Sequence, residues 1–465
     1  MKFQGGDTMQ KHPISLAILA CFGSLALTAP AHAASMEELQ AEIAAQKARL
    51  EKLEEVLKAT AATAANATKK AEEASKAAAD APAKSKGLAM PAGLTIYGII
   101  DGGVEIGDYG QGTKTRVQSG MGSASRLGFK GERSFGDDLT AYFQLEAGVS
   151  IDNGQNTGHS SNVSNPGQGA ASSASVNSTG VAIFSRNTFV GLNSKRFGDL
   201  RFGRDYAPLY SITSTSDPFT IGGATAFRLW SSAAASRFDN AVFYATPTLA
   251  GFQGKIAYSA GMENNSEADV GVSGGAPGNS NTGPEGEGKG VSASLTYSQG
   301  PLFLGAGYLS FQRMGDVVAP ATEGKQRTAW NLAATYDLKF AKLYGQFLHG
   351  EDTQDGAAVH TSLDRNIWWL GFAVPFMDRH TVRGVYGHLD DRRPTDRDSD
   401  HYGVGYEFAL DKQTDLYAYY AKVTNKNGGT NSLCAGGTCQ GYDSSSGLPA
   451  NFSPSSLMLG ARYRF

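Results

Sequence analysis

The last nine residues, Leu457-Met-Leu-Gly-Ala-Arg-Tyr-Arg-Phe465, alternate in polarity and end on an aromatic side chain. In an extended strand, Leu457, Phe465 and the odd-numbered residues between them fall on one face, whereas Arg462 and Arg464 fall on the other. A soluble protein must cover the apolar face and the edge of such a strand to avoid aggregation. A membrane β-barrel covers both, because lipid contacts the face and another strand pairs with the edge. The stretch therefore favours a barrel over the alternative, a surface strand of a soluble sandwich.

The composition of the whole chain agrees with a membrane barrel. Its 465 residues carry a formal net charge of only −3, so no bulk field favours nucleic acid as a partner. No apolar run after residue 34 is long enough to form a transmembrane helix in the mature protein. This does not exclude a membrane protein, because barrel strands are short and alternate in polarity.

The N-terminus carries an export signal. Basic residues precede an apolar stretch from Ile14 to Leu27, which is followed by the small-x-small cleavage site Ala31-His32-Ala33. We expect a signal peptide over residues 1–33, and Met9 is a second candidate for the start of the chain. A lipoprotein site ending at Cys21 is the alternative, although apolar residues continue beyond this cysteine.

Residues 34–80 have a helical period. From Met36 to Ala78, mostly apolar residues follow an unbroken 3-4 spacing, with Glu and Lys between them. A seam of about six heptads predicts a coiled coil, and a single amphipathic helix is the alternative. Pro and Gly residues in the segment 81–93 end this helix and form a linker.

From residue 94 to residue 465 the period changes to two. In the first stretch Val104 falls on an apolar face, whereas Asp101 and Glu105 fall on the opposite face. We expect sixteen strands, near 94–106, 125–133, 138–149, 184–193, 198–204, 237–246, 251–261, 289–299, 301–313, 325–338, 341–352, 364–376, 378–390, 400–410, 414–425 and 456–465. The predicted fold is all-β, a sixteen-stranded antiparallel transmembrane β-barrel preceded by an α-helical coiled coil. Barrels of this size enclose a water-filled lumen.

The connections between these strands alternate in length. Short turns such as 136–138 alternate with long polar stretches such as 152–182, as in outer-membrane barrels. The connection from Arg204 to Arg237 differs, because it is long but rich in aromatic residues. We expect it to pack against the inside of its own barrel.

Four motifs, Ser125-Arg-Leu-Gly-Phe-Lys-Gly-Glu132, Ser185-Arg-Asn-Thr-Phe-Val-Gly-Leu192, Gly203-Arg204 and the final Tyr463-Arg-Phe465, occur in this order. They resemble motifs of the trimeric general porins of Gram-negative bacteria, of the β-proteobacterial type. The N-terminal extension is similar to that of dicarboxylate-type porins. The resemblance implies that the third loop folds into the lumen and forms a constriction, with arginines on the wall facing acids on the loop.

The resemblance also implies the residues of this constriction. They are Arg126, Arg186, Arg228, Asp217 and Glu146. A second loop acid of the family is absent, because Ile221 occupies its position. The excess of arginine favours anions, although Asp205 would partly offset it. For each arginine the alternative is a lumen charge without a special function, above all for Arg228.

Other residues suggest roles outside the constriction. Tyr463 and Phe465 resemble the assembly signal of the family. Cys434 and Cys439 lie close together in an exported chain, which predicts a small disulfide loop, and metal binding by this pair is the weaker alternative. The eight His show no metal-ligand spacing, so we expect no metal site and no cofactor.

The sequence therefore predicts an outer-membrane porin for passive diffusion of small hydrophilic solutes, with a preference for anions. No nucleophile-base set, zinc motif or phosphate loop is found, so we expect no enzyme. The expected partners are two further copies in a homotrimer, outer-membrane lipid, lipopolysaccharide, and small anionic or neutral solutes. The alternative is an envelope tether, in which the periplasmic coiled coil binds the cell wall or another partner and the barrel is an anchor.

Overall fold

The computed structural model describes residues 93–154, 183–230, 236–260, 289–312, 326–353, 363–433 and 448–465, and the helical residues Ala44, Lys47 and Glu51. The predicted signal peptide, most of the predicted coiled coil, most of the linker, Cys434 and Cys439 lie outside these residues. The chain divides into the compact units Met1–Ala89 and Met90–Phe465, and all the strands below belong to the second. No helix in the described ranges is long and apolar enough to cross a membrane.

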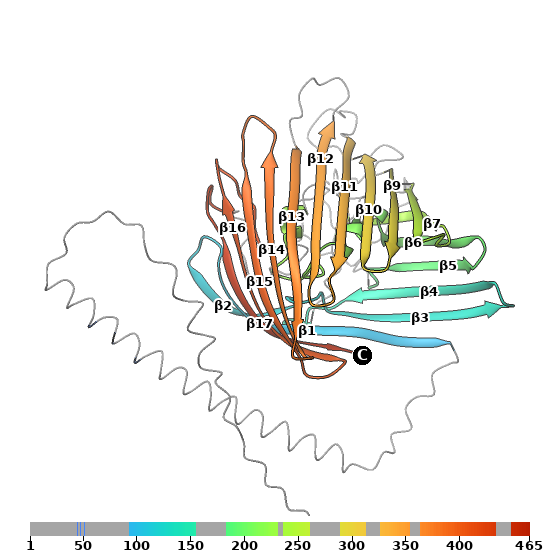
Figure 1. Cartoon of the computed structure of the whole chain (residues 1–465), viewed down its shortest axis with the longest axis horizontal. Helices are drawn as coiled ribbons and strands as arrows, with labels where there is room; N and C mark the ends of the chain where they lie inside the picture. Colours follow the sequence, from blue (N-terminus) through green and yellow to red (C-terminus); the bar gives the residue numbers. More distant parts are fainter. Residues whose placement is uncertain are drawn as a thin grey trace, which may run out of the picture. The chain divides into compact units, whose positions relative to one another are not determined.

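The strands of the second unit form a closed antiparallel ring (Figure 1), because β1 pairs with both β2 and β3, each strand from β3 onward pairs with the next, and β17 pairs with β1. The strands are β1 (Leu94–Asp108), β2 (Thr113–Ser119), β3 (Arg126–Phe135), β4 (Leu139–Gly148), β5 (Thr188–Ser194), β6 (Gly198–Tyr206), β7 (Arg237–Ala245), β8 (Phe252–Ser259), β9 (Gly290–Gln299), β10 (Leu302–Gln312), β11 (Gln326–Asp337), β12 (Lys342–Thr353), β13 (Asp364–Phe376), β14 (His380–Asp391), β15 (Ser399–Ala409), β16 (Thr414–Asn425) and β17 (Ser455–Arg464). The predicted sixteen-stranded barrel is confirmed.

The sequence pattern did not predict β2, which shares one position of the ring with β3. β1 pairs with β3 from Leu94 to Ile99 and with β2 from Gly102 to Asp108. The residues 120–125 that separate β2 from β3 interrupt this pairing. The sequence Thr-Lys-Thr-Arg-Val-Gln-Ser of β2 is polar on both faces, so the period-two signal is lost there.

The alternation predicted for the last strand is confirmed. In β17, Leu459 and Tyr463 remain 44% and 45% exposed, whereas Met458 and Arg462 are buried. Large apolar side chains are exposed in the same alternating way on the other strands, for example Ile100 and Val104 in β1. In an outer-membrane barrel these outward side chains contact lipid.

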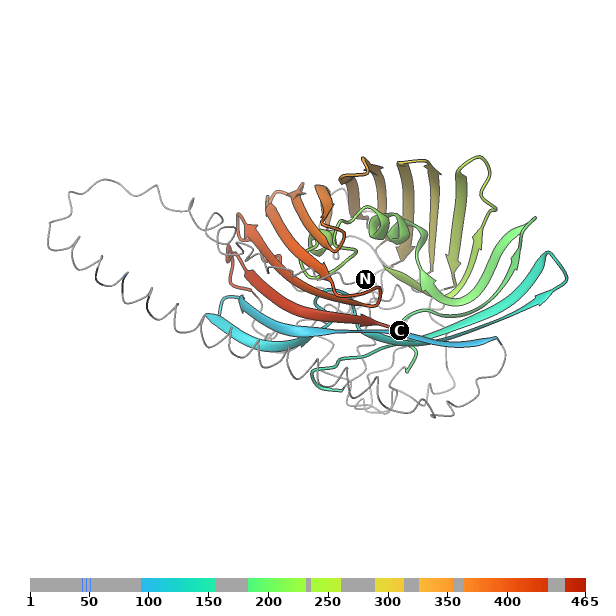
Figure 2. The same cartoon turned by 60° about the horizontal axis from the view of Figure 1, so that its bottom comes forward.

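The third long connection, between β6 and β7, runs inside the ring of strands. It contains the short helices α2 (Pro208–Thr215) and α3 (Phe227–Trp230), and the green segment with α2 lies within the barrel (Figure 2). Glycines of the wall make room for it, since a Cβ on Gly403 would collide with the carbonyl oxygen of Ala224. The predicted inward-folded third loop is confirmed.

Candidate functional site

The third loop is anchored to the inner wall by side chains from successive strands. Asn331 of β11 donates to Thr213 Oγ1 over 3.0 Å, and Ser216 Oγ donates to Gln346 Oε1 of β12 over 2.6 Å. Trp369 of β13 donates its indole N–H to the Ser216 carbonyl oxygen over 3.0 Å. These wall groups satisfy polar atoms of a loop that would otherwise be buried without partners. The loop therefore has a fixed position in the lumen.

A second inward segment holds the far part of the loop. The interruption between β2 and β3 contains Met121 and Gly122, and the Gly223 N–H of the loop donates to the Met121 carbonyl oxygen over 2.5 Å. On the neighbouring wall, Phe219 packs edge-on against Tyr419 of β16, with ring centroids 5.3 Å apart. The described part of the loop thus contacts the wall from β9 round to the β2–β3 interruption.

Two of the predicted arginines lie together on the side of the lumen that is formed by β3 to β7, opposite the wall that anchors the third loop. Arg186 pairs with Glu146 of β4, with 2.6 Å between Nε and Oε1. The other Glu146 oxygen accepts from the Tyr97 hydroxyl over 3.0 Å. Arg126 donates to the Ala124 carbonyl oxygen over 2.9 Å and to Ser123 Oγ over 3.1 Å. Within the described residues no carboxylate pairs directly with Arg126.

A third arginine at this place was not predicted. Arg237, the first residue of β7, stacks over the Tyr206 ring at 4.1 Å from its centroid and donates to Asn187 Oδ1 over 3.1 Å. Arg186 donates to the hydroxyl of the same Tyr206 over 3.1 Å. Tyr206 in turn stacks on Tyr210 of α2, with centroids 4.9 Å apart. We call Arg126, Arg186, Arg237 and Glu146 the arginine cluster.

The arginine cluster has more cations than anions. Glu146 is the carboxylate that contacts it among the described residues, and both Arg186 and Arg126 act on this group electrostatically. Burial disfavours the charged form of Arg186, but the nearby Tyr206 and the carboxylate of Glu146 outweigh burial and raise its pKa above the ordinary value. Guanidinium groups remain protonated at physiological pH, so the cluster carries a net positive charge.

The remaining predicted constriction residues are in the loop. Asp217 is 3% exposed, and its carboxylate accepts from the backbone N–H groups of Phe219 and Ile221 and from the Thr225 hydroxyl. It therefore contributes to the shape of the loop, and its place on the negative side of a constriction stays a prediction. The backbone of Arg228 lies in α3, and its side chain lies outside the described part of the chain.

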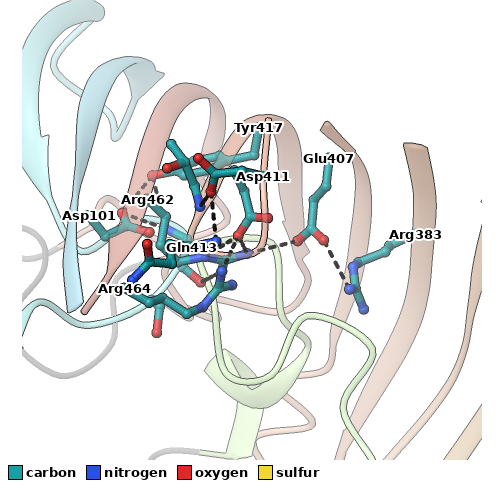
Figure 3. A network of polar contacts seen from close by, with 12 residues as sticks. Asp101, Arg383, Glu407, Asp411, Gln413, Tyr417, Arg462 and Arg464 are labelled. Carbon is teal, nitrogen blue, oxygen red and sulfur yellow. Dashed lines mark hydrogen bonds and ion pairs between the residues drawn. The ribbon is translucent and has the colours of Figure 1, made fainter. Parts of the chain in front are cut away.

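A second polar cluster lies on the wall formed by β1 and β14 to β17 (Figure 3). Arg383 pairs with Glu407 over 2.9 Å, and Arg462 pairs with Asp415 over 3.0 Å. Asp101 is fully buried and accepts from the Tyr417 hydroxyl over 2.6 Å. Together with Arg464, which also pairs with Asp415 over 2.6 Å, these residues form the balanced cluster of three arginines and three carboxylates, in which each arginine has a carboxylate partner. Arg383 also donates to the Pro218 carbonyl oxygen, so this cluster fixes the loop.

The predicted assembly residues lie at the seam that closes the barrel. The Gly98 N–H donates to the Phe465 carbonyl oxygen over 3.0 Å, and the Phe465 N–H donates to the Gly98 carbonyl oxygen over 3.2 Å. The Tyr463 and Phe465 rings stack outside the barrel with centroids 6.1 Å apart. Their role in assembly stays a prediction.

The chain is similar to proteins of a known family. The chain is 27% identical over 398 residues to outer membrane porin protein 32 of Delftia acidovorans, covering 82% of this chain and 97% of that protein. It is also 27% identical over 370 residues to an outer membrane porin protein of Bordetella pertussis, covering 71% of this chain and 89% of that protein. The solved anion-selective porin from Comamonas acidovorans has the same fold, with a TM-score of 0.62 at 23% identity over 80% of this chain and 99% of the other.

A family model described as Gram-negative porin matches residues 59–428, which is more than half of the chain. This span includes the third loop, the arginine cluster and most of the ring of strands. The chain therefore belongs to the Gram-negative porin family, and its sixteen-stranded barrel is an outer-membrane channel.

Proposed function

We propose that this porin passes small hydrophilic solutes and prefers anions, with the arginine cluster at its constriction. The main evidence is that, among the described residues, three arginines and one contacting carboxylate lie beside Tyr206. Charged side chains that line the narrow part of a pore select ions by short-range electrostatics. The constriction is completed by the inward third loop, with Asp217 and Arg228 as its loop residues.

Two further observations support this proposal. The loop that narrows the lumen is fixed by the balanced cluster and by wall hydrogen bonds, so the arginines face a stationary partner. A structural relative is described as an anion-selective porin. The similarity to that relative concerns the fold alone. The excess of arginine in the arginine cluster is the physical reason to expect a preference for anions.

Reversal potentials in a salt gradient test the proposal. For protein in planar bilayers we expect chloride to permeate better than potassium. The double variant Arg126→Ala/Arg186→Ala should shift the reversal potential toward cations, because one charge at about 4 Å contributes ~1–4 kcal/mol between water and an effective dielectric of 20. A cation-selective wild type would contradict the preference for anions. An unchanged reversal potential in the double variant would show that these residues do not line the constriction.

We further propose that the mature protein is a homotrimer in which the coiled coil of residues 34–80 assists assembly from the periplasm. Deletion of residues 35–86 should lower the yield of folded protein and leave a trimeric barrel. A monomeric barrel after deletion would contradict this division of roles. Retention on isolated cell wall that depends on residues 34–80 would favour the tether as an additional function.

Phe465 is proposed to act in insertion. Its ring lies at the seam between β1 and β17, on the lipid side. Phe465→Ala should reduce the amount of folded protein in the outer membrane and leave the conductance of inserted channels unchanged. Equal insertion of variant and wild type in the presence of the assembly machinery would contradict this role.

A further inference from the structure

A cavity of about 200 Å³ lies on the inner wall beneath the start of α2. It is lined by residues of β6, β7 and β8 and by Pro208 and Ser211 of α2. Asp199 and Ala245 place it near the rim where the turns are short, since β6 begins and β7 ends there. In outer-membrane barrels this is the periplasmic rim. The cavity is therefore on the periplasmic side of the arginine cluster, and Tyr206 and Asn187 line the part nearest the cluster.

The acidic groups of this cavity are already occupied by the wall. Asp199 pairs with Arg201 over 2.5 Å and also accepts from the Tyr142 hydroxyl. Asp205 pairs with Arg201 and accepts from Asn187 Nδ2 over 2.6 Å. Their lone pairs thus face protein donors, and neither carboxylate needs a cation from solution.

Lys255 differs from these groups. It lines the cavity from β8, and no hydrogen bond or ion pair joins its ammonium to any residue that the structure describes. An ammonium group offers three N–H donors. Phe243 and Pro208 provide apolar surface beside it. The cavity therefore combines one cation that lacks an acceptor with a short apolar wall.

We propose that this cavity is a binding subsite for small carboxylates with a short apolar chain, held by Lys255. The carboxylate accepts from the Lys255 ammonium, and the chain packs against Phe243 and Pro208. Charge-assisted hydrogen bonds are the stronger kind, and a partly enclosed cavity reduces screening. The subsite rests on the proposed function in one respect: a solute that has passed the arginine cluster reaches this cavity next.

Butyrate is the probe, and binding is measured without conduction. Saturation-transfer NMR of butyrate on the folded full-length porin should give a saturable signal, whereas propyltrimethylammonium, a cation of similar size, should give none. Lys255→Met should weaken butyrate binding about tenfold, the effect of losing one hydrogen bond to a charged group. Lys255→Arg should retain binding. Lys412→Met, in the exposed turn between β15 and β16, is the matched control and should bind like wild type.

A second measurement needs no variant. Acetylation of Lys255 by an amine-reactive ester, followed by mass spectrometry, should slow when butyrate is present, while acetylation of Lys412 in the same sample should not change. Equal butyrate binding by wild type and Lys255→Met, or no protection of Lys255, would overturn the subsite. A cation-selective pore that still binds butyrate through Lys255 would overturn the proposed preference for anions alone.

Discussion

The arginine cluster and the balanced cluster use the same side chain for opposite purposes. In the balanced cluster Arg383 and Arg462 each contact a carboxylate, and they hold the third loop or its neighbours in place (Figure 3). In the arginine cluster Arg126 has only a carbonyl and a hydroxyl as acceptors among the described residues. A paired charge in a buried wall is costly to leave without its partner, whereas a charge that has no carboxylate partner remains available to a solute. Four changes test this contrast.

The largest effect is expected on stability, in the balanced cluster. Arg462→Gln removes one of the two arginine partners of Asp415 and a donor to the Gly122 carbonyl oxygen, at a residue that is 8% exposed. Breaking a buried pair should lower the free energy of unfolding by about 3 kcal/mol. Urea unfolding from lipid vesicles, followed by fluorescence, measures it. Arg464→Gln is the matched control, because Arg464 pairs with the same Asp415 but is more exposed, and it should cost at most about 1 kcal/mol. Equal losses of unfolding free energy in the two variants would show that the burial of the arginine does not set the cost.

The next effect is on selectivity, in the arginine cluster. Arg237→Gln removes one cation over the Tyr206 ring, so the chloride preference should fall severalfold. Arg379→Gln, in the exposed turn between β13 and β14, removes the same charge far from the cluster and should leave the reversal potential unchanged. If both variants shift the potential equally, the net charge of the barrel and not the cluster sets selectivity.

A smaller shift in the opposite direction is expected from Glu146→Gln. The amide keeps an acceptor for Arg186 but removes the negative charge, so chloride should be favoured more strongly than in wild type. The effect is smaller because the cluster is already positive. A shift toward potassium in the same salt-gradient assay would show that Glu146 acts by positioning Arg186 and not by its charge.

Ionic strength should give the smallest change. The Debye length falls from about 10 Å at 0.1 M to about 3 Å at 1 M, so the difference in selectivity between wild type and Arg237→Gln should narrow. Urea midpoints of Arg462→Gln relative to wild type should change little over the same range, because a buried pair is screened less. A selectivity difference that persists at 1 M would indicate a steric and not an electrostatic filter.

Much of the barrel could be predicted from alternation, and the exceptions have physical causes. Arg126 and Arg186 can be assigned because they lie in motifs that resemble those of the family, and Glu146 because it resembles the wall glutamate of the family. Arg237 was missed because the second half of β7 is apolar on both faces, with Phe243 inside and Tyr244 outside, so the facing of the strand is ambiguous in sequence. The inward alternation of Arg237, Ala241 and Phe243 is the signal that could have found it.

The hydrogen bonds of Asp217 are local, and residue spacing in the sequence does not reveal them. Asp217 is assigned to the constriction by the resemblance to the family, and no sequence pattern shows which donors a carboxylate will meet. In the folded loop those donors are within eight residues of it, at Phe219, Ile221 and Thr225. Short polar residues in turns commonly bond to their own backbone neighbourhood.

The seam between β1 and β17 has a consequence for how the protein is made. One edge of β1 pairs with β2 and β3, and the other edge obtains its partner from β17, where Phe465 closes the backbone pairing at Gly98. A chain cut short during translation would lack this partner and keep an open strand edge. We therefore expect that a polypeptide without these residues cannot close the ring of strands and forms no pore in the membrane.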